Sequence, residues 1–403
     1  MLNHSQEHIV IVGAGLVGAT LAALLVNNDA SNNLRITLID HGEAPILNHN
    51  EPYEYDPRVV ALTLSSQKIL QDLGVWHTIE GLGVCDYRDM VVWDNDGTGT
   101  IDFHAKDIGQ NHLGSIVENR IVLHSVLALL ENHNNISVLR GQSVEALEQD
   151  ENMVSLTLED GQVIDASLLV AADGGLSKIR TLAGLTIREE SYEQAAIIAT
   201  VKTQKPHQAT AWQNFLSSGP LALLPLHGAD QCHSSIVWSA DTAIADDLMA
   251  LTNTAFDENL SRALEARFGK TTVVGKRYCI PLVARHAQHY FDRRVVLAGD
   301  AAHTIHPLAG QGVNLGLQDA NSLAQEIIRA QSRQLPINDV SVLRRYQRQR
   351  KQNNAEMLLL MKSFKTLFGQ RSPWVRLARN YGLTTFNTIK PIKNWLAKQA
   401  SGI

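Results

Sequence analysis

The most regular hydrophobic pattern of the chain lies near its amino-terminal end. Residues 8–12 form a short apolar run that predicts a buried strand, and Gly13-Ala14-Gly15-Leu16-Val17-Gly18 follows it directly. Residues 19–26 predict a buried helix, after which residues 34–39 predict a second strand that ends at Asp40. This order of strand, glycine-rich turn, helix and strand predicts a βαβ unit.

The rest of the chain divides into a β-rich stretch and a helical end. From residue 187 to 282 the apolar runs are short and typical of strands, with one helix expected near residues 258–268. Residues 295–298 predict another buried strand, and a long helix pattern follows from Gly310 to about Ala330. We therefore predict an α/β fold. It has a Rossmann-like domain from residues 1–185 and 286–335, an inserted β-sheet domain from 186–285 and C-terminal helices from 336–403.

The first glycine-rich segment has the spacing of a dinucleotide-binding turn. Gly13 permits the tight turn, Gly15 lets the backbone approach a pyrophosphate, and Gly18 lets helix and strand pack closely. The helix start offers free N–H groups and a partial positive charge to phosphates. Asp40 lies 22 residues beyond Gly18, where a carboxylate can accept hydrogen bonds from ribose hydroxyls. The pattern favours FAD or NAD over NADP; a glycine-rich turn in an unrelated α/β fold is the alternative.

A second candidate segment begins at Gly299-Asp300, directly after a predicted buried strand, and runs to Asn314. An acid at the end of a strand, before a glycine-rich loop and a helix, suits the hydroxyls of a polyol. The positive end of that helix would stabilise an anionic reduced flavin. Alternatively, Asp300 only caps the helix. His303 and His306 are three residues apart, but no third ligand has suitable spacing, so we expect no metal site.

The two segments, with Asp173-Gly174 between them, resemble the class A flavoprotein monooxygenases of the para-hydroxybenzoate hydroxylase fold. Within that group, the run GDAAHTIHPLAGQGVNLG is similar to the signature of the ubiquinone-biosynthesis hydroxylases. The segments VVWDNDG and HLGSIVEN are most similar to the 2-polyprenylphenol hydroxylase branch. The branches that act on the 6-position or on the demethoxy intermediate are the alternatives.

The resemblance implies a set of FAD contacts. It places the diphosphate at Gly13, Gly15 and Gly18, and the adenosine ribose at Asp40. Asp173 and Gly174, with Ser177 and Arg180, match a segment tied to FAD phosphate and pyridine-nucleotide handling, although Ala171 departs from the glycine common there. The other implied contacts are Arg58, Arg120, Gly299, Asp300, Pro307, Gly310, Gln311, Gly312 and Asn314. For Arg58 and Arg120 a surface salt bridge is the alternative.

The implied reaction is hydroxylation of a polyprenylphenol intermediate of ubiquinone biosynthesis, with FAD, O2 and NAD(P)H as transient reductant. Oxygen would be transferred from a hydroperoxide at flavin C4a. We assign no catalytic side chain, because the flavin carries the chemistry. Residues 186–285 are expected to supply an apolar pocket. The alternatives are hydroxylation at another ring position, a flavoenzyme for a different phenol or alkene, and a non-catalytic flavin-binding scaffold of a membrane-associated assembly.

Charge is distributed unevenly along the 403 residues. The net charge of −6 argues against nucleic acid as a partner. From Ser341 onward, however, 13 Lys and Arg residues stand against one acid. This basic end predicts contact with an anionic membrane or with other ubiquinone-biosynthesis proteins; a solvated helix face is the alternative. An apolar helix face is predicted there from Met357, Leu360, Met361, Phe364, Leu367 and Phe368.

The cysteines and the first residues predict the compartment. Cys85, Cys232 and Cys279 are far apart in sequence and form no disulfide framework, which favours a reducing environment. The first ten residues do not have the pattern of a secretory signal. We therefore expect a cytoplasmic protein, peripheral at the inner face of the membrane.

Overall fold

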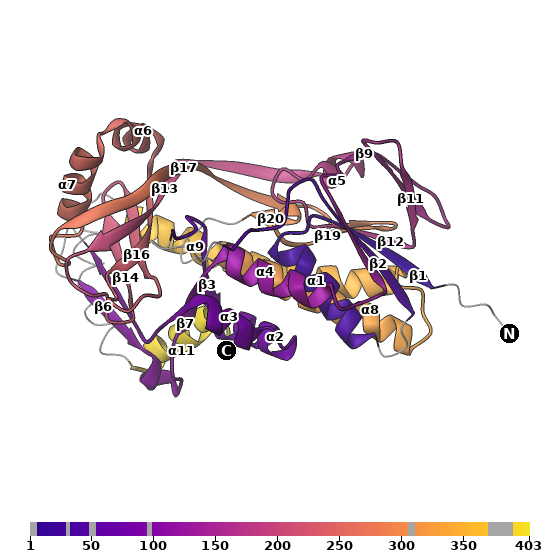
Figure 1. Ribbon diagram of the computed structural model, residues 1–403, viewed down its shortest axis with the longest axis horizontal. Helices are drawn as coiled ribbons and strands as arrows, with labels where there is room; N and C mark the ends of the chain where they lie inside the picture. The colour runs from indigo at the N-terminus through magenta and orange to yellow at the C-terminus, as the bar shows by residue number, and fades with distance from the viewer. Residues whose placement is uncertain (1–5, 30–32, 48–53, 95–98, 305–310, 370–389) are drawn as a thin grey trace.

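A six-stranded and largely parallel sheet forms the centre of one half of the molecule (Figure 1). The computed structural model describes residues 6–29, 33–47, 54–94, 99–304, 311–369 and 390–403. The strand order is β18-β19-β12-β1-β2-β8, with only the β18–β19 pair antiparallel. The strands are β1 (Glu7–Val12), β2 (Leu34–Asp40), β8 (Ile136–Arg140), β12 (Leu168–Ala171), β18 (Phe291–Asp292) and β19 (Val295–Leu297).

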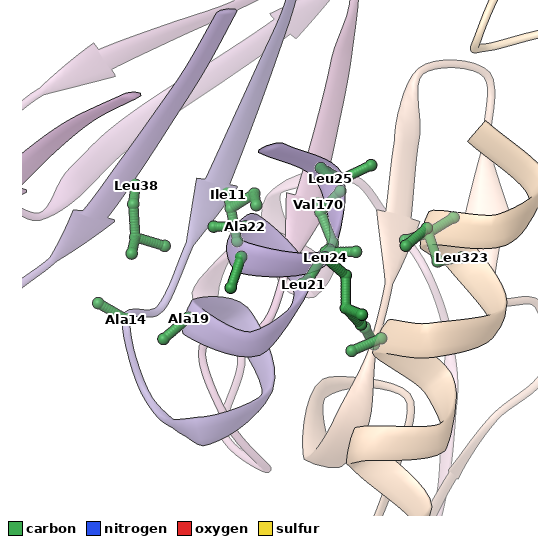
Figure 2. Packing of buried hydrophobic residues seen from close by; sticks show 14 of the residues in the cluster. Ile11, Ala14, Ala19, Leu21, Ala22, Leu24, Leu25, Leu38, Val170 and Leu323 are labelled. Atoms are coloured by element: carbon green, nitrogen blue, oxygen red, sulfur yellow. The ribbon is translucent and has the colours of Figure 1, made fainter. Parts of the chain in front are cut away.

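Helix α1 (Leu16–Asn28) is buried against this sheet, because it is apolar on nearly all sides. Figure 2 shows Leu24 and Leu25 of α1 in one apolar cluster with Val170 of β12 and Leu323 of α8 (Gln311–Ser332). A three-stranded sheet adds Val154, Leu156 and other residues to the same cluster. Its strands are β9 (Val144–Gln149), β10 (Val154–Leu158) and β11 (Val163–Ala166).

An eight-stranded sheet forms the other half of the molecule, at the left of Figure 1. Its order is β20-β17-β13-β16-β15-β14-β5-β6. The two longest strands, β13 and β17, pair antiparallel and extend from this half toward the first sheet. The strands are β5 (Asp89–Asp94), β6 (Thr100–His104), β13 (Ile187–Thr203), β14 (Thr210–Leu216), β15 (Gly219–Pro225), β16 (His233–Asp241), β17 (Thr271–Ala287) and β20 (His303–Thr304).

One face of the eight-stranded sheet is covered by α6 (Thr242–Ala250) and α7 (Asn253–Ala263). A small sheet of order β3-β7-β4 lies between the two halves. Its strands are β3 (Val59–Thr63), β4 (Val84–Tyr87) and β7 (Gly114–Glu118). The remaining helical elements are α2 (Leu64–Asp72), α3 (Trp76–Gly83), α4 (Asn119–Leu130), α5 (Lys178–Leu182), α9 (Val340–Gly369) and α11 (Lys390–Ser401), with short 3-10 turns η1 (Ala105–Ile108) and η2 (Gly299–Ala301).

The predicted α/β fold is confirmed, and several details differ from the sequence prediction. Strands β5 and β6 join the eight-stranded sheet although they come from within residues 1–185. The single helix expected near residues 258–268 is α7, five residues earlier at each end, and α6 precedes it. Helix α6 was not predicted because it is short and carries a polar run of two aspartates.

Candidate cofactor site

The four sequence segments predicted to bind a cofactor lie in one row along the sheet. Strands β2, β1, β12 and β19 are neighbours in that order and run parallel. Asp40 is the last residue of β2, and Gly13, Asp173 and Gly299 follow within two residues of the ends of β1, β12 and β19. The chain order reverses across β1, and in open α/β sheets ligands bind at such a switch point, outside the carboxyl ends of the strands.

The three glycines of the first turn are required for different reasons. A Cβ at Gly18 would lie 1.9 Å from the carbonyl oxygen of Gly13, and a Cβ at Gly13 would lie 2.3 Å from that of Ala172. Protein packing therefore excludes a side chain at both positions. A Cβ at Gly15 meets nothing within 4 Å, and the backbone there is extended rather than left-handed. The protein itself leaves room at Gly15, and Gly15 forms the start of α1, where unpaired N–H groups favour a phosphate.

Asp40 is already tied to the glycine-rich turn. Its Oδ2 accepts the N–H of Ala14 at 2.5 Å, and its Oδ1 accepts the N–H of Gly42 at 2.7 Å. A carboxylate has about four acceptor positions, so these two bonds leave capacity for ribose hydroxyls. The contact also fixes the turn against the end of β2.

Asp173 is hydrogen-bonded to the start of the short helix α5, whose N-cap is Ser177. Its two oxygens accept the Ser177 hydroxyl at 2.5 Å and the Ile179 N–H at 3.1 Å. Arg180 on the same helix donates to the carbonyls of Ala301 (2.9 Å) and Gly175 (3.0 Å), and burial lowers the pKa of its guanidinium. This segment therefore braces the loop after Gly299 from within the protein.

Asp300 is the acid with the least protein support at the site. Its side chain is exposed to solvent, and its carboxyl accepts no hydrogen bond from the residues that the structure describes. The surrounding protein nevertheless raises its pKa by desolvation. A solvent-accessible carboxylate that is bonded to no described protein group is free to accept hydrogen bonds from a ligand. Asp300 lies within η2 and well before Gln311, the first residue of α8, so the structure gives it no role as a helix cap.

The two glycine-rich segments are in direct contact through Val17. A Cβ at Gly316 of α8 would lie 2.5 Å from Cγ2 of Val17, and one at Gly299 would lie 3.0 Å from the same atom. Gly299 has a φ of +60°, which favours glycine independently. Helices α1 and α8 thus approach closely enough to bring both segments to one site.

Asn314 links α8 to strand β3. It is buried, its Nδ2 donates to the carbonyl of Ala61 at 2.8 Å, and its Oδ1 accepts the N–H of Thr63 at 2.9 Å. Gln311 and Gly312 form the first turn of α8. Pro307 and Gly310, also predicted to border the flavin ring, lie outside the described residues.

The two candidate arginines lie near the start of β3 and have different surroundings. Arg58 is exposed, and its backbone N–H bonds to the Asp56 side chain at 2.9 Å. Arg120 pairs with the buried Glu118 at 2.8 Å and donates to the carbonyl of Glu54. Glu118 also accepts the N–H of Asp56 at 2.6 Å, so Arg120 and Glu118 hold the segment that carries Arg58.

Sequence reasoning missed an ionic cluster behind the Gly299 loop. Asp319 of α8 contacts His303 at 2.5 Å and Arg350 of α9 at 2.6 Å. His303 had been considered only as a metal ligand. His303 lies 16 residues before Asp319, and Arg350 lies 31 residues after it. At such separations no sequence pattern indicates that the side chains are in contact.

Two further observations concern other kinds of site. Within the described ranges, no three His, Cys, Asp or Glu side chains are grouped so as to hold a metal ion. A polar cavity of about 580 Å³, lined in part by Gln6, Arg35 and His133, lies beside the amino ends of β1, β2 and β8. It is therefore at the opposite edge of the sheet from the glycine-rich turns.

These residues fit FAD, since the row of strand ends, the open position at Gly15 and the unbonded carboxyl of Asp300 each suit one part of it. A family model described as "FAD binding domain" matches residues 6–359. The chain is 35% identical to the ubiquinone hydroxylase UbiL of Rhodospirillum rubrum, covering 98% of this chain and 89% of that protein. It is 32% identical to the 3-demethoxyubiquinol 3-hydroxylase of Escherichia coli, over all of both chains.

Solved structures show the same fold at low sequence identity. The p-nitrophenol 4-monooxygenase PnpA of Pseudomonas putida superposes with a TM-score of 0.80 at 18% identity, covering 98% of this chain and 97% of that one. HpxO of Klebsiella pneumoniae, solved with FAD and uric acid, has a TM-score of 0.73 at 16% identity, covering 99% and 98%. The chain therefore belongs to the FAD-binding family of flavoprotein monooxygenases, and its relatives within that family include ubiquinone hydroxylases.

Proposed function

We propose that this FAD-dependent monooxygenase hydroxylates the ring of a polyprenylphenol intermediate in ubiquinone biosynthesis. The observation that supports it most strongly is the similarity to ubiquinone-pathway hydroxylases along the whole chain. Bound FAD supplies the activation of O2. One oxygen atom enters the ring in place of a C–H hydrogen and becomes a hydroxyl, the other leaves as water, and NAD(P)H supplies the two electrons.

An apolar surface suited to such a substrate lies on the eight-stranded sheet, opposite α6 and α7. Ile198, Val237 and Ala222 are direct cross-strand partners and therefore share a face, and Leu224 follows on the same side. All four are half-buried, whereas their neighbours Ile197, Ile236 and Leu223 pack fully into the core under the helices. Each CH2 of an isoprenoid chain buried on such a surface contributes about 0.8 kcal/mol.

This surface reaches the cofactor side of the molecule at strand β3. Leu224 packs in a cluster with Ala61 of β3, Ile116 of β7 and Leu226. Ala61 is the residue whose carbonyl Asn314 of α8 holds. The apolar sheet face and the flavin-bordering segments are thus joined by one strand, and we expect the phenol ring to bind there with its tail along the sheet.

Polar groups border the cluster at its edge. The Tyr55 hydroxyl donates to the backbone carbonyl of His227 at 2.6 Å, and the two rings meet edge to face with centroids 5.4 Å apart. Burial lowers the pKa of His227, so its imidazole is neutral at physiological pH. We propose that these two residues orient the ring hydroxyl rather than take part in oxygen transfer.

The basic carboxyl-terminal end supports peripheral membrane contact as part of this function. Helix α11 is held on η1 by Asn394, which donates to the carbonyl of Asp107 at 2.8 Å, and by Lys393, which lies 3.7 Å from the Asp107 carboxylate. Trp395 on the same helix is 57% exposed, and Lys398 is also exposed. Tryptophan and lysine together are typical of a membrane interface. No helix among the described residues is long and apolar enough to cross a bilayer.

Profiling of quinone intermediates tests the proposal. Cells lacking the protein are expected to accumulate one under-hydroxylated polyprenyl precursor, and the wild-type gene is expected to restore the normal profile. Restoration by a variant that cannot bind FAD would indicate a scaffold role instead. An unchanged profile in the deletion strain would refute a role in the pathway.

A further inference from the structure

The ionic cluster behind the Gly299 loop joins three segments that are distant in sequence. Asp319 comes from α8, His303 from β20 and Arg350 from α9. The side chains of Asp319 and His303 are 0% exposed and that of Arg350 is 4% exposed. A charge buried to this degree is costly unless it is paired and hydrogen-bonded.

Asp319 is hydrogen-bonded to the loop on both sides of Asp300. Its Oδ2 accepts the backbone N–H of Gly299 at 3.0 Å and contacts Nε2 of His303 at 2.5 Å. Its Oδ1 accepts Nε–H of Arg350 at 2.6 Å. Burial alone would raise the pKa of Asp319, but His303 and Arg350 outweigh it and hold the pKa below its usual value. The carboxylate is therefore ionised, and bonds to an ionised acceptor are shorter and stronger than neutral ones.

Arg350 is itself fixed in place. Its Nη2 donates to the carbonyl of Leu315 at 3.2 Å and to Oδ1 of Asn354 at 3.2 Å. Asn354 in turn donates to the hydroxyl of Tyr290 at 3.1 Å. The orientation of Asp319 thus depends on helix α9, in the region that the sequence separated from the cofactor domain.

We propose that Asp319, oriented by Arg350, is the positioning residue of the FAD site. By binding the Gly299 N–H and the His303 side chain, it fixes the backbone position of Asp300 and so the place of the Asp300 carboxylate. Asp319 acts without contacting the cofactor itself. Helix α9 is consequently part of the cofactor site. The proposal rests on FAD binding and not on the identity of the substrate, so a failure to hydroxylate a polyprenylphenol would leave it unaffected.

The chain offers closely matched controls for the test. Arg345, five residues before Arg350 on α9, makes the same type of bond to Glu326 of α8, also at 2.6 Å, but touches no part of the loop. The buried Tyr346 hydroxyl donates to the carbonyl of Leu297 at 2.8 Å, just before the loop. Arg345→Gln thus removes a more exposed ion pair between the same two helices, α8 and α9. Tyr346→Phe removes an equally buried hydrogen bond.

The experiment measures FAD affinity, bound-flavin absorption and midpoint potential for Asp319→Asn and Arg350→Gln against the two controls. Each measurement is made at a temperature where all variants are folded by circular dichroism. We expect the FAD Kd to rise at least tenfold in both cluster variants, and the potential of the remaining bound flavin to differ from the wild-type value. The controls are expected to stay within threefold of wild type in Kd and to keep its spectrum and potential.

The proposal would be overturned if the cluster variants had a lower melting temperature but an unchanged FAD Kd and flavin potential, since that result would show a purely structural role. Equal losses of affinity in Arg345→Gln would overturn it as well. If Asp319→Asn does not fold, Arg350→Lys keeps the cation and alters only the geometry. A smaller rise in Kd than in Arg350→Gln is then expected, and no rise in either arginine variant would refute the proposal.

Discussion

Gly15 and Gly18 allow packing and cofactor binding to be separated by two single-methyl substitutions. A Cβ at Gly15 meets no protein atom within 4 Å, whereas one at Gly18 would lie 1.9 Å from the carbonyl oxygen of Gly13. Gly15→Ala should therefore leave the apoprotein folded and weaken FAD binding. Gly18→Ala should weaken the fold first and FAD binding only as a consequence.

The expected magnitudes follow from the local structure. Gly15 is the N-cap of α1, and alanine there is less favourable than glycine, by roughly 0.5–1 kcal/mol. Restricting the unfolded chain returns about 0.4–1 kcal/mol, so the stability of apo Gly15→Ala stays close to wild type. At Gly18 the clash is with backbone, which cannot rotate away, and overpacking of this kind costs about 1–3 kcal/mol or more.

The assay is a melting curve for each apoprotein together with FAD titration by fluorescence quenching. For Gly15→Ala we expect an unchanged apo melting temperature and an FAD affinity lower by about tenfold or more, equivalent to about 1.4 kcal/mol. Gly15→Val should abolish binding. Wild-type FAD affinity in Gly15→Val would show that the diphosphate lies elsewhere, and a large loss of apo stability in Gly15→Ala would contradict the packing argument.

Four further predictions concern Asp300, Asn314 and the basic carboxyl-terminal end. Asp300→Ala should lose the bound-flavin absorbance at about 450 nm. Asp300→Asn should raise the melting temperature of the apoprotein at pH 7. The pKa of Asp300 is raised in the folded protein, so ionisation of its carboxyl destabilises the fold as the pH rises through that pKa. The gain in melting temperature should vanish below about pH 4, where the carboxyl is protonated in both states. Asn314→Ala should lower the free energy of unfolding by about 1–3 kcal/mol, since it leaves the Ala61 carbonyl and the Thr63 N–H without their partner. Chemical denaturation measures this loss. An FAD affinity equal to wild type would exclude a role of Asn314 in holding β3 for the cofactor. Charge reversal at Lys362, Lys365 and Arg376 should weaken sedimentation with anionic liposomes at low salt, and binding that is absent, or insensitive to the reversals, would reject an electrostatic membrane contact.

The elements predicted best were those whose signal is local. The strand, turn, helix and strand from β1 to Asp40 were predicted within a few residues, because a buried parallel strand must be continuously apolar and the glycines punctuate it. The sheet to which β5 and β6 belong was not predicted, since the pairing of β5 with β14 joins residues 89 and 210. No pattern within either strand specifies so distant a partner.

The candidate site shows the same division. That Gly13, Asp40 and Asp300 would lie along the same edge of the sheet could be inferred, because each lies at the carboxyl end of a predicted buried strand. The contact of Asn314 with β3 could not be inferred. Its amide is bonded to that strand, whose place beside α8 depends on tertiary packing. Asp319 gave no signal at all, since an aspartate on a helix is ordinarily a surface residue and only its burial marks it as different.

The carboxyl-terminal charge is less available to a membrane than the composition alone suggests. Of the 13 basic residues from Ser341 onward, Arg345 and Arg350 pair with acids of α8, and Lys393 lies beside Asp107. These three cations are engaged by carboxylates of the protein itself. The electrostatic part of any membrane contact must therefore come from the others, at about 1 kcal/mol for each cation near an anionic surface. Because Arg350 orients the acid behind the flavin loop, the same helix that leads toward the basic end also completes the cofactor site. Charge reversals meant to test membrane binding should accordingly avoid the residues before 355, where a loss of binding and a loss of FAD would be indistinguishable.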